Sequence, residues 1–278
     1  MILITGGRGA VATALTALLL ERGLPVRVGS ADPSALTLPD GVPGVALNLA
    51  DPTTFPAALD GVTSVFLYAR AEGADAFAHA AHAAGVEHIV LLSSASVLVD
   101  DPQDNPLATA HLTVEQALLA GPVPVTILRP GAFAANAGGW ARAIKAGQPV
   151  DLPYPDAYTE PVHDLDLAES ALAALTDPAH RGGAFDLSGP ASITLAEQVD
   201  LLGRELGRPT AFRTITAEQW KAQMARYMPG GYADALLELW RTAVGNPGEP
   251  ADGVAHLTGH PARGFAQWAA DHRADFEN

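Results

Sequence analysis

The sequence of 278 residues contains no cysteine, which excludes disulfide bonds, thiolate metal ligands and a cysteine nucleophile. Basic residues are few: 16 lysines and arginines stand against 31 acidic residues, a formal net charge of −15. Nucleic acids and anionic membrane surfaces both attract Lys and Arg, so neither is expected as a partner. No apolar run is long enough to cross a bilayer, and no basic segment precedes the apolar stretch 11–20 as in a signal peptide. We therefore expect a cytoplasmic protein.

Segments with strand character and segments with helix character alternate through the first two thirds of the chain. Several strand segments are unbroken runs of valine, isoleucine and leucine, which is typical of parallel strands buried on both faces. The predicted strands are 2–5, 25–29, 44–48, 64–68, 88–93, 125–129 and 184–187. The predicted helices are 11–22, 52–59, 74–84, 107–119 and 165–175. This alternation predicts an α/β fold with a doubly wound parallel sheet and helices on both of its faces.

The pattern changes twice along the chain. Residues 136–159 are rich in turn-forming and aromatic residues, which is typical either of a segment that covers a ligand or of a plain connecting loop. After residue 190 the sequence becomes mainly helical, with capping boxes expected at Thr194–Glu197 and Thr216–Gln219. We predict a dinucleotide-binding core over 1–135, to which 160–190 returns. Segments 136–159 and 191–278 would form a smaller, mainly helical subdomain that covers the substrate.

A glycine-rich turn lies between the first predicted strand and the first predicted helix. Glycines let the backbone approach a pyrophosphate, and the free amides and dipole of a new helix favour its negative charge. The spacing Gly6-x-x-Gly9-x-x-Ala12 differs from the commoner G-x-G-x-x-G, and ordinary tight turns also collect glycine. The position between strand and helix favours a phosphate cradle. The residues predicted to form it are Thr5, Gly6, Gly7, Arg8, Gly9, Ala10 and Val11.

Further segments make the sequence similar to a known family over nearly its whole length. They are 84–90 leading into Ser93-Ser94, 126–133 with Asn136, 162–168 and 185–190. With the glycine turn, these segments resemble the NmrA-like proteins, an atypical branch of the short-chain dehydrogenase/reductase superfamily. The resemblance implies a Rossmann-type sheet with an additional C-terminal helical subdomain, and NAD(P) bound across the strand ends. Some members of the family reduce quinones and dyes with NADPH, whereas others only sense the cofactor and bind a regulatory protein.

The resemblance also indicates where the cofactor would lie. Relatives often have arginine where this chain has Ala31, but Ser30 and Arg8 could still hold a 2′-phosphate, so Arg8 favours NADP(H) over NAD(H). Asp32 precedes Pro33 and is expected to be a turn residue. Tyr68 would line the passage to the nicotinamide ribose or, equally, only close the end of its strand. The other implied cofactor contacts are Asn48, Leu49, Ala69, Arg70, Ser93, Pro130, Gly131 and Phe133.

The reaction centre differs from the superfamily's usual Tyr-x-x-x-Lys pair. This chain has His111-x-x-x-Glu115, and helical spacing puts both side chains on one largely apolar face. In the catalytic interpretation, Glu115 accepts a hydrogen bond from a ribose hydroxyl or from His111. That contact would favour the imidazolium and let His111 donate a proton. In the alternative, a His–Glu hydrogen bond only ties the helix to the sheet.

Other polar groups complete the predicted site. Ala95 stands where the superfamily places its catalytic Ser or Thr, which argues against a full acid–base triad and for an acceptor that is easily reduced. The predicted substrate contacts are Ser94, Ser96, Trp140, Tyr154 and Tyr158. No metal site is expected, because His88 begins a strand away from His79 and His82 and no cysteine is available. The acids of 163–166 are expected to cap a helix N-terminus.

These patterns together predict an NAD(P)-dependent oxidoreductase. It would transfer hydride from nicotinamide to a small conjugated acceptor of the quinone, dye or carbonyl type. The alternative is a non-catalytic NAD(P) sensor that binds a protein partner. Nucleotide-sugar epimerisation is disfavoured because the Tyr-x-x-x-Lys pair is missing. The sequence leaves open which small molecule is the substrate and whether the protein is a monomer or a homodimer.

Overall fold

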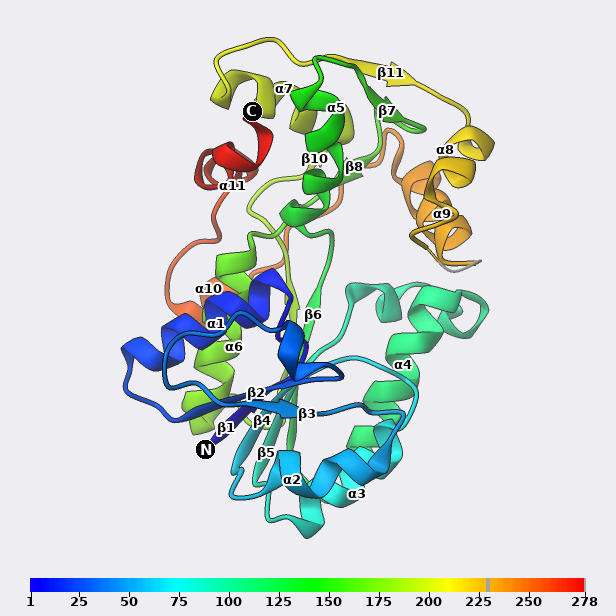
Figure 1. The fold of residues 1–278 in the computed structure, drawn as a ribbon. Helices are drawn as coiled ribbons and strands as arrows, with labels where there is room; N and C mark the ends of the chain where they lie inside the picture. The colour runs from blue at the N-terminus through cyan, green and yellow to red at the C-terminus, as the bar shows by residue number, and fades with distance from the viewer. Residues whose placement is uncertain (229–230, 278) are drawn as a thin grey trace.

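The computed structural model describes residues 1–228 and 231–277. Its centre is a seven-stranded parallel sheet with the strand order β3-β2-β1-β4-β5-β6-β9 (Figure 1). The strands are β1 (Ile2–Ile4), β2 (Val26–Ser30), β3 (Gly44–Ala46), β4 (Ser64–Tyr68), β5 (His88–Leu92), β6 (Val125–Pro130) and β9 (Ala184–Leu187). The order reverses between β1 and β4, and the glycine turn follows β1 there. The predicted doubly wound sheet is confirmed, with every predicted strand in it.

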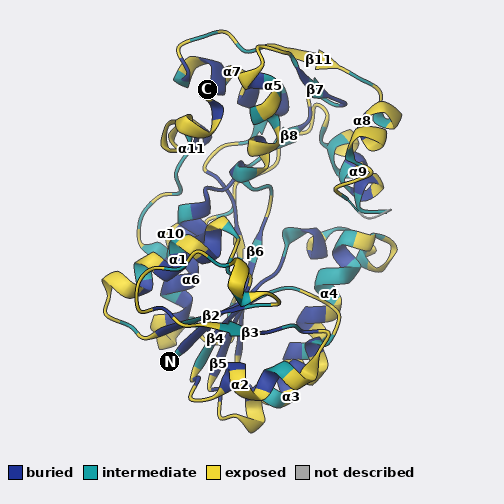
Figure 2. Ribbon diagram, in the orientation of Figure 1, coloured by how far each residue is buried: buried dark blue, intermediate teal, exposed yellow. Residues whose placement is uncertain are grey.

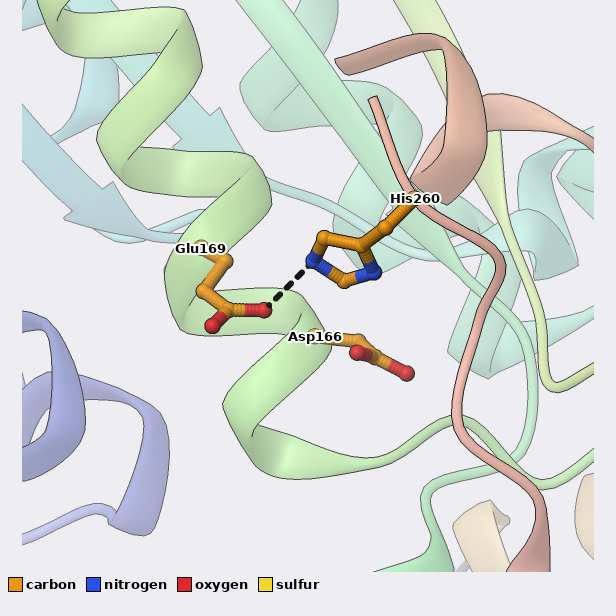
Figure 3. A group of neighbouring side chains, drawn as sticks. All are labelled: Asp166, Glu169 and His260. Atoms are coloured by element: carbon orange, nitrogen blue, oxygen red, sulfur yellow. Dashed lines mark hydrogen bonds and ion pairs between the residues drawn. The ribbon is translucent and has the colours of Figure 1, made fainter. Parts of the chain in front are cut away.

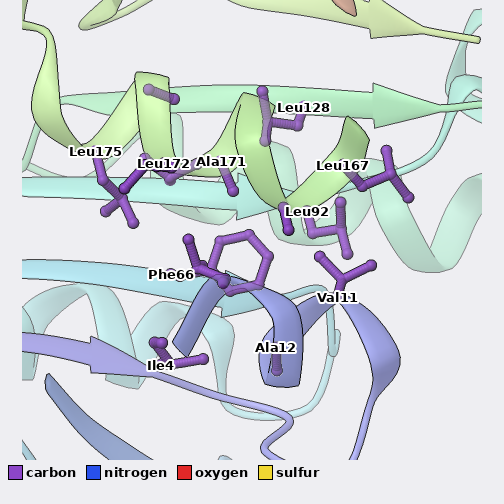
Figure 4. Packing of buried hydrophobic residues seen from close by; sticks show 14 of the residues in the cluster. Ile4, Val11, Ala12, Phe66, Leu92, Leu128, Leu167, Ala171, Leu172 and Leu175 are labelled. Atoms are coloured by element: carbon purple, nitrogen blue, oxygen red, sulfur yellow. The ribbon is translucent and has the colours of Figure 1, made fainter. Parts of the chain in front are cut away.

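Two hydrophobic cores cover the two faces of the sheet. Side chains alternate along each strand, so Phe66 points to one face while Val65 and Leu67 point to the other. The first face packs against α1 (Ala10–Glu21), α6 (Asp164–Thr176) and α10 (Gly253–Thr258). Figure 4 shows Phe66, Leu92 and Leu128 of the strands packed with side chains of α1 and α6. The second face packs against α2 (Phe55–Leu59), α3 (Ala74–Ala83) and α4 (Pro106–Leu119).

A smaller subdomain lies beyond the carboxyl ends of the strands (Figure 1). It has its own buried core, which includes Trp268 and Phe265. Figure 2 shows buried residues among the helices of this part of the molecule. Its helices are α5 (Ala141–Lys145), α7 (Leu195–Glu205), α8 (Ala217–Met224), α9 (Tyr232–Ala243) and α11 (Phe265–Asp271). Two small sheets pair β7 (Val150–Leu152) with β11 (Phe212–Thr214), and β8 (Tyr158–Thr159) with β10 (Ile193–Thr194). These short strands were not predicted.

Short 3-10 helices connect the larger elements. They are η1 (Pro33–Ala35), η2 (Pro52–Thr54), η3 (Ala95–Leu98), η4 (Pro102–Asp104), η5 (Ala134–Trp140), η6 (Pro178–His180) and η7 (Arg273–Phe276). Both expected capping boxes form, at the N-termini of α7 and α8. Helix α10 lies within the range predicted for the subdomain, yet Val254 and Leu257 pack in the first core of the sheet. Among the described residues, no helix combines the length and apolarity needed to span a membrane.

The N-terminus of α6 joins the core to the C-terminal segment. The acids there do not cap the helix as expected: the cap is His163, whose Nδ1 accepts from the Leu165 amide at 3.0 Å. Asp164 instead accepts from the Trp268 indole at 2.8 Å, and Asp166 binds Arg263. The partners lie far away in sequence, so local spacing could not reveal them.

One group at this junction has the spacing of a metal site. Potential metal-ligand atoms of Asp166, Glu169 and His260 all lie within 4.8 Å of one another. His260 Nε2 lies 3.0 Å from Glu169 Oε2 (Figure 3). However, the Arg263 guanidinium donates to both carboxylates, with Nη1 2.7 Å from Glu169 Oε2. A side-chain cation thus binds both acids of this group and offsets part of their negative charge.

Candidate active site

The glycine turn has the geometry of a phosphate cradle. Gly6 adopts φ +67°, which glycine tolerates best, and its carbonyl accepts from the Gly9 amide at 2.9 Å. A Cβ on Gly7 would lie 2.3 Å from Val28, so the turn sits directly on β2. No side chain caps the N-terminus of α1 and its first turn has no acid, which leaves amides there for an anion. The residues present therefore fit a diphosphate.

Tyr68 supports this turn from the end of β4. A Cβ on Gly6 would come within 2.6 Å of its ring, and one on Gly9 within 2.8 Å of its hydroxyl. Burial raises the pKa of Tyr68 to about 12, so the phenol stays protonated at neutral pH. The backbone amide of Tyr68 also donates to the Thr5 hydroxyl at 2.9 Å. The structure thus places the ring against the glycine turn, and its predicted approach to the nicotinamide ribose stays a prediction.

The groups predicted to meet the adenosine end lie together after β2. The Ser30 hydroxyl donates to the Asp32 carbonyl, and Asp32 accepts from the Ser34 amide at 3.1 Å, which confirms it as a turn residue. The Ser34 hydroxyl lowers the pKa of Asp32 most, and the positive charge of nearby Arg8 adds to this effect. Arg8 is exposed at the turn. The structure therefore brings Arg8 and Ser30 into one neighbourhood, together with an acid.

The remaining positions on this side of the sheet differ in their freedom to contact a ligand. Asn48 Oδ1 accepts from the Ala50 amide at 3.1 Å, which leaves the side-chain NH₂ for a partner. Leu49 is buried in the second core. Ala69 donates its amide to the Leu92 carbonyl, and Arg70 is exposed beyond the strand end. Their predicted contacts with the dinucleotide stay predictions.

Glu115 has partners other than those expected. It is almost fully buried on α4, and Arg129 donates to it through Nε at 3.0 Å and Nη2 at 2.6 Å. The Ser93 hydroxyl, at the end of β5, donates to Glu115 Oε1 at 2.6 Å. The expected hydrogen bond between Glu115 and His111 does not appear in this arrangement. The sequence analysis did not identify Arg129 as a site residue. A lone arginine in an otherwise apolar strand nevertheless requires a partner, and this was the available signal.

His111 lies one turn before Glu115 on α4 and is partly buried. Burial lowers the pKa of His111 below its ordinary 6.5, and the negative charge of Glu115 offsets only part of this effect. This shift favours the neutral ring, whereas the catalytic interpretation of the sequence favoured the imidazolium. Within the described residues, its buried Nδ1 has no hydrogen-bond partner. A buried polar atom of this kind is available to a ligand.

The serines after β5 have different roles. Ser94 accepts from the Ser96 amide at 3.1 Å and so caps η3, which fixes its side chain. Ser96 is buried, and its hydroxyl lacks a partner in the described part of the chain. Because η3 packs against α4, Ser96 and His111 lie on neighbouring elements at the carboxyl edge of the sheet. Of the two predicted substrate serines, Ser96 has the freer hydroxyl.

The last of the predicted cofactor contacts, and the aromatic residues predicted to contact substrate, lie between the end of β6 and the subdomain. Pro130 ends β6, the Gly131 amide donates to the Leu187 carbonyl at 3.0 Å, and Phe133 bridges to Val162. Trp140 and Tyr154 pack in part against the subdomain core. Tyr158 lies in β8, opposite Thr194 of β10. These aromatic residues belong to the subdomain beyond the strand ends, and their contact with substrate stays a prediction.

The sheet order, the glycine turn at its reversal point and the capless helix define a Rossmann-type dinucleotide-binding protein. Comparison with known proteins agrees: residues 6–178 match the NAD(P)H-binding family, and the chain belongs to it. It is 37% identical over 281 residues to a (4-alkanoyl-5-oxo-2,5-dihydrofuran-3-yl)methyl phosphate reductase of Streptomyces griseus, with 99% of each chain covered. It is 33% identical over 289 residues to an NAD(P)H azoreductase of Xenophilus azovorans, again with 99% of each covered.

A solved structure gives the same fold at lower identity. The NADPH complex of a quinone oxidoreductase from Escherichia coli superposes with a TM-score of 0.79 at 22% identity, covering 98% of this chain and 99% of that one. The resemblance to atypical short-chain dehydrogenases is confirmed. The chain is an NAD(P)H-dependent oxidoreductase of that type, because it belongs to the NAD(P)H-binding family and the two full-length relatives named above are reductases.

Proposed function

We propose that this enzyme reduces a carbon–carbon double bond conjugated to a carbonyl group, as in an unsaturated lactone, an enone or a quinone. The observation that carries the proposal is the fit of the glycine turn to a diphosphate, on a sheet edge that also presents His111. The full-length relative that is 37% identical is named for a dihydrofuranone with an alkanoyl group, which is an acceptor of this kind.

The chemistry of the site favours such an acceptor over a simple carbonyl. Reduction of an isolated carbonyl leaves an alkoxide that needs a strong proton donor, and this chain has no Tyr-x-x-x-Lys pair. In a conjugated acceptor the added negative charge spreads to a carbonyl oxygen, where a neutral hydrogen-bond donor stabilises it. His111 and the Ser96 hydroxyl could supply such donors, and the product takes its proton from water. The dinucleotide, when bound, supplies the hydride.

We further propose that NADPH is preferred over NADH. The support is Arg8, which is exposed on the glycine turn close to Ser30 and could pair with a 2′-phosphate. Asp32 opposes this preference, because its carboxylate repels a phosphate. The expected preference is therefore modest.

The test is oxidation of NADPH, followed at 340 nm, with matched pairs of acceptors. Each pair holds an unsaturated lactone, ketone or quinone and its saturated analogue. The proposal predicts turnover of the conjugated member of each pair, with the product reduced at the carbon–carbon bond or the quinone, and none of the saturated member. Preferential reduction of saturated aldehydes would contradict it. Tight binding of NADPH without any turnover would favour a sensor instead.

A further inference from the structure

A buried ion pair joins α4 to the sheet directly beside His111. The Glu115 side chain is 3% exposed and that of Arg129 is 20% exposed. Two hydrogen bonds from the guanidinium and one from Ser93 hold the carboxylate, so both of its oxygens have donors. Such bidentate, charge-assisted contacts are strong and fix the position of the carboxylate. Glu115 is thus a carboxylate whose charge is offset by a specific partner.

The position of this pair matters because α4 carries His111 one turn earlier on the same face. Side chains four residues apart on a helix are neighbours, so an uncompensated carboxylate at 115 would favour the imidazolium form at 111. The guanidinium opposes this field because it binds the carboxylate directly. Arg129 on β6 can therefore influence the protonation of His111 through Glu115, without contacting the ring.

We propose that Arg129 is a positioning residue that weakens the field of Glu115 at His111, by binding Glu115 in a bidentate pair on the face of α4 that carries both side chains, and so helps burial to keep the ring uncharged. His111 then meets the substrate as a neutral ring with one donor and one acceptor nitrogen. The catalytic role of the neutral ring rests on the proposed function. The protonation state of His111 does not depend on that function.

Other charged groups on the elements around α4 do not take this role. Helix α4 packs against α3, η3, η4, α9 and β6, and η3 has no charged side chain. Apart from Arg129 and the partly buried Tyr232 of α9, the charged or titratable groups on these elements are exposed to solvent. They are Asp75, His79, His82, Asp104, Asp234, Glu238 and Arg241. Water and salt screen exposed charges, so the buried pair dominates the field at His111.

The experiment is an NMR pH titration of the His111 ring in the full chain without dinucleotide or acceptor. The wild type should titrate with a midpoint below 6.5. Arg129→Met removes the cation at similar length and should raise the midpoint, because the unpaired carboxylate gains most from a proton on the neighbouring ring. Arg129→Lys keeps the positive charge and should stay closer to the wild type. Glu115→Gln/Arg129→Met removes both charges and should not show the rise.

An unchanged midpoint in folded Arg129→Met would overturn the proposal, as would a wild-type midpoint above 6.5. If Arg129→Met does not fold, Glu115→Gln decides instead. Loss of the carboxylate with Arg129 retained should lower the midpoint of His111, and a rise would refute the proposed field. A protein that reduces no acceptor would still give these titrations, so failure of the proposed function stays distinguishable. If turnover is observed, Arg129→Met should change the pH profile of kcat more than the KM for NADPH.

Discussion

The contact between Gly9 and Tyr68 makes the glycine turn testable by a single methyl group. The backbone of Gly9 has φ −81° and ψ 148°, which alanine adopts freely. Gly9→Ala therefore tests the steric effect of a Cβ at this position without adding backbone strain. The new Cβ would lie 2.8 Å from the Tyr68 hydroxyl, whereas ordinary contacts begin at 3.4 Å. Either the turn or the buried ring must move. Overpacking of this kind costs about 1–3 kcal/mol.

If the turn moves, the backbone amides in the first turn of α1 no longer point toward the diphosphate. We then expect NADPH to bind about 5- to 150-fold more weakly, which is this free energy converted to a ratio of dissociation constants. The assay is a titration followed by nicotinamide fluorescence. The matched control is Gly9→Ala/Tyr68→Phe, in which the nearest atoms to the new Cβ lie at 3.4 Å, and it should recover most of the affinity. Tyr68→Phe alone should bind nearly as the wild type does. Wild-type affinity in Gly9→Ala, or a double variant as weak as the single one, would refute the reasoning.

Three further predictions concern coenzyme choice and stability. Arg8→Ala should reduce the ratio of NADH to NADPH dissociation constants by about tenfold, as expected for loss of one phosphate contact; Ala31→Arg should increase it, and no change in Arg8→Ala would contradict the assignment. Arg263→Ala leaves the buried Asp166 without its cation and should lower the free energy of unfolding by about 3 kcal/mol, with Arg263→Lys less affected. Arg263 and His260 hold the pKa of Glu169 below 4.5 although burial raises it, so this loss should shrink as pH falls below 4.5. Burial lowers the pKa of His88 to about 4, so the unfolded chain binds a proton between pH 6.5 and 4 that the folded one does not; urea unfolding should show about 2 kcal/mol lower stability at pH 5 than at pH 7, and a smaller loss in His88→Gln.

The sheet could be predicted closely because its signals are local. The strands β4 and β9 have the predicted bounds, since β4 contains the apolar run 65–67 and the turn formers 188–190 follow β9. Both capping boxes formed for the same reason, as donor and acceptor lie three residues apart. The strands β7, β8, β10 and β11 escaped prediction because two- or three-residue strands depend on partners far along the chain. Helix α10 likewise returns to the core through contacts that no local pattern encodes.

The site was predictable in outline and not in its pairings. Helical periodicity placed His111 and Glu115 on one face, and their strand-side surroundings followed from the sheet. The hydrogen-bond partner of Glu115 could not be predicted, because Arg129 lies on another element. Whether Glu115 binds His111, a ribose or an arginine depends on distances in three dimensions. The charge of His111 depends on burial, which the sequence indicates only as a tendency. For this reason the structure favours a neutral ring at His111, where the catalytic interpretation of the sequence favoured the imidazolium.

The most direct test of the account is a crystal structure with NADPH. The account predicts the diphosphate on the amides of residues 6–11 at the N-terminus of α1, with the nicotinamide at the carboxyl edge of the sheet beside His111. A dinucleotide bound away from the glycine turn, or a turn that Tyr68 keeps closed to it at saturating NADPH, would contradict the account.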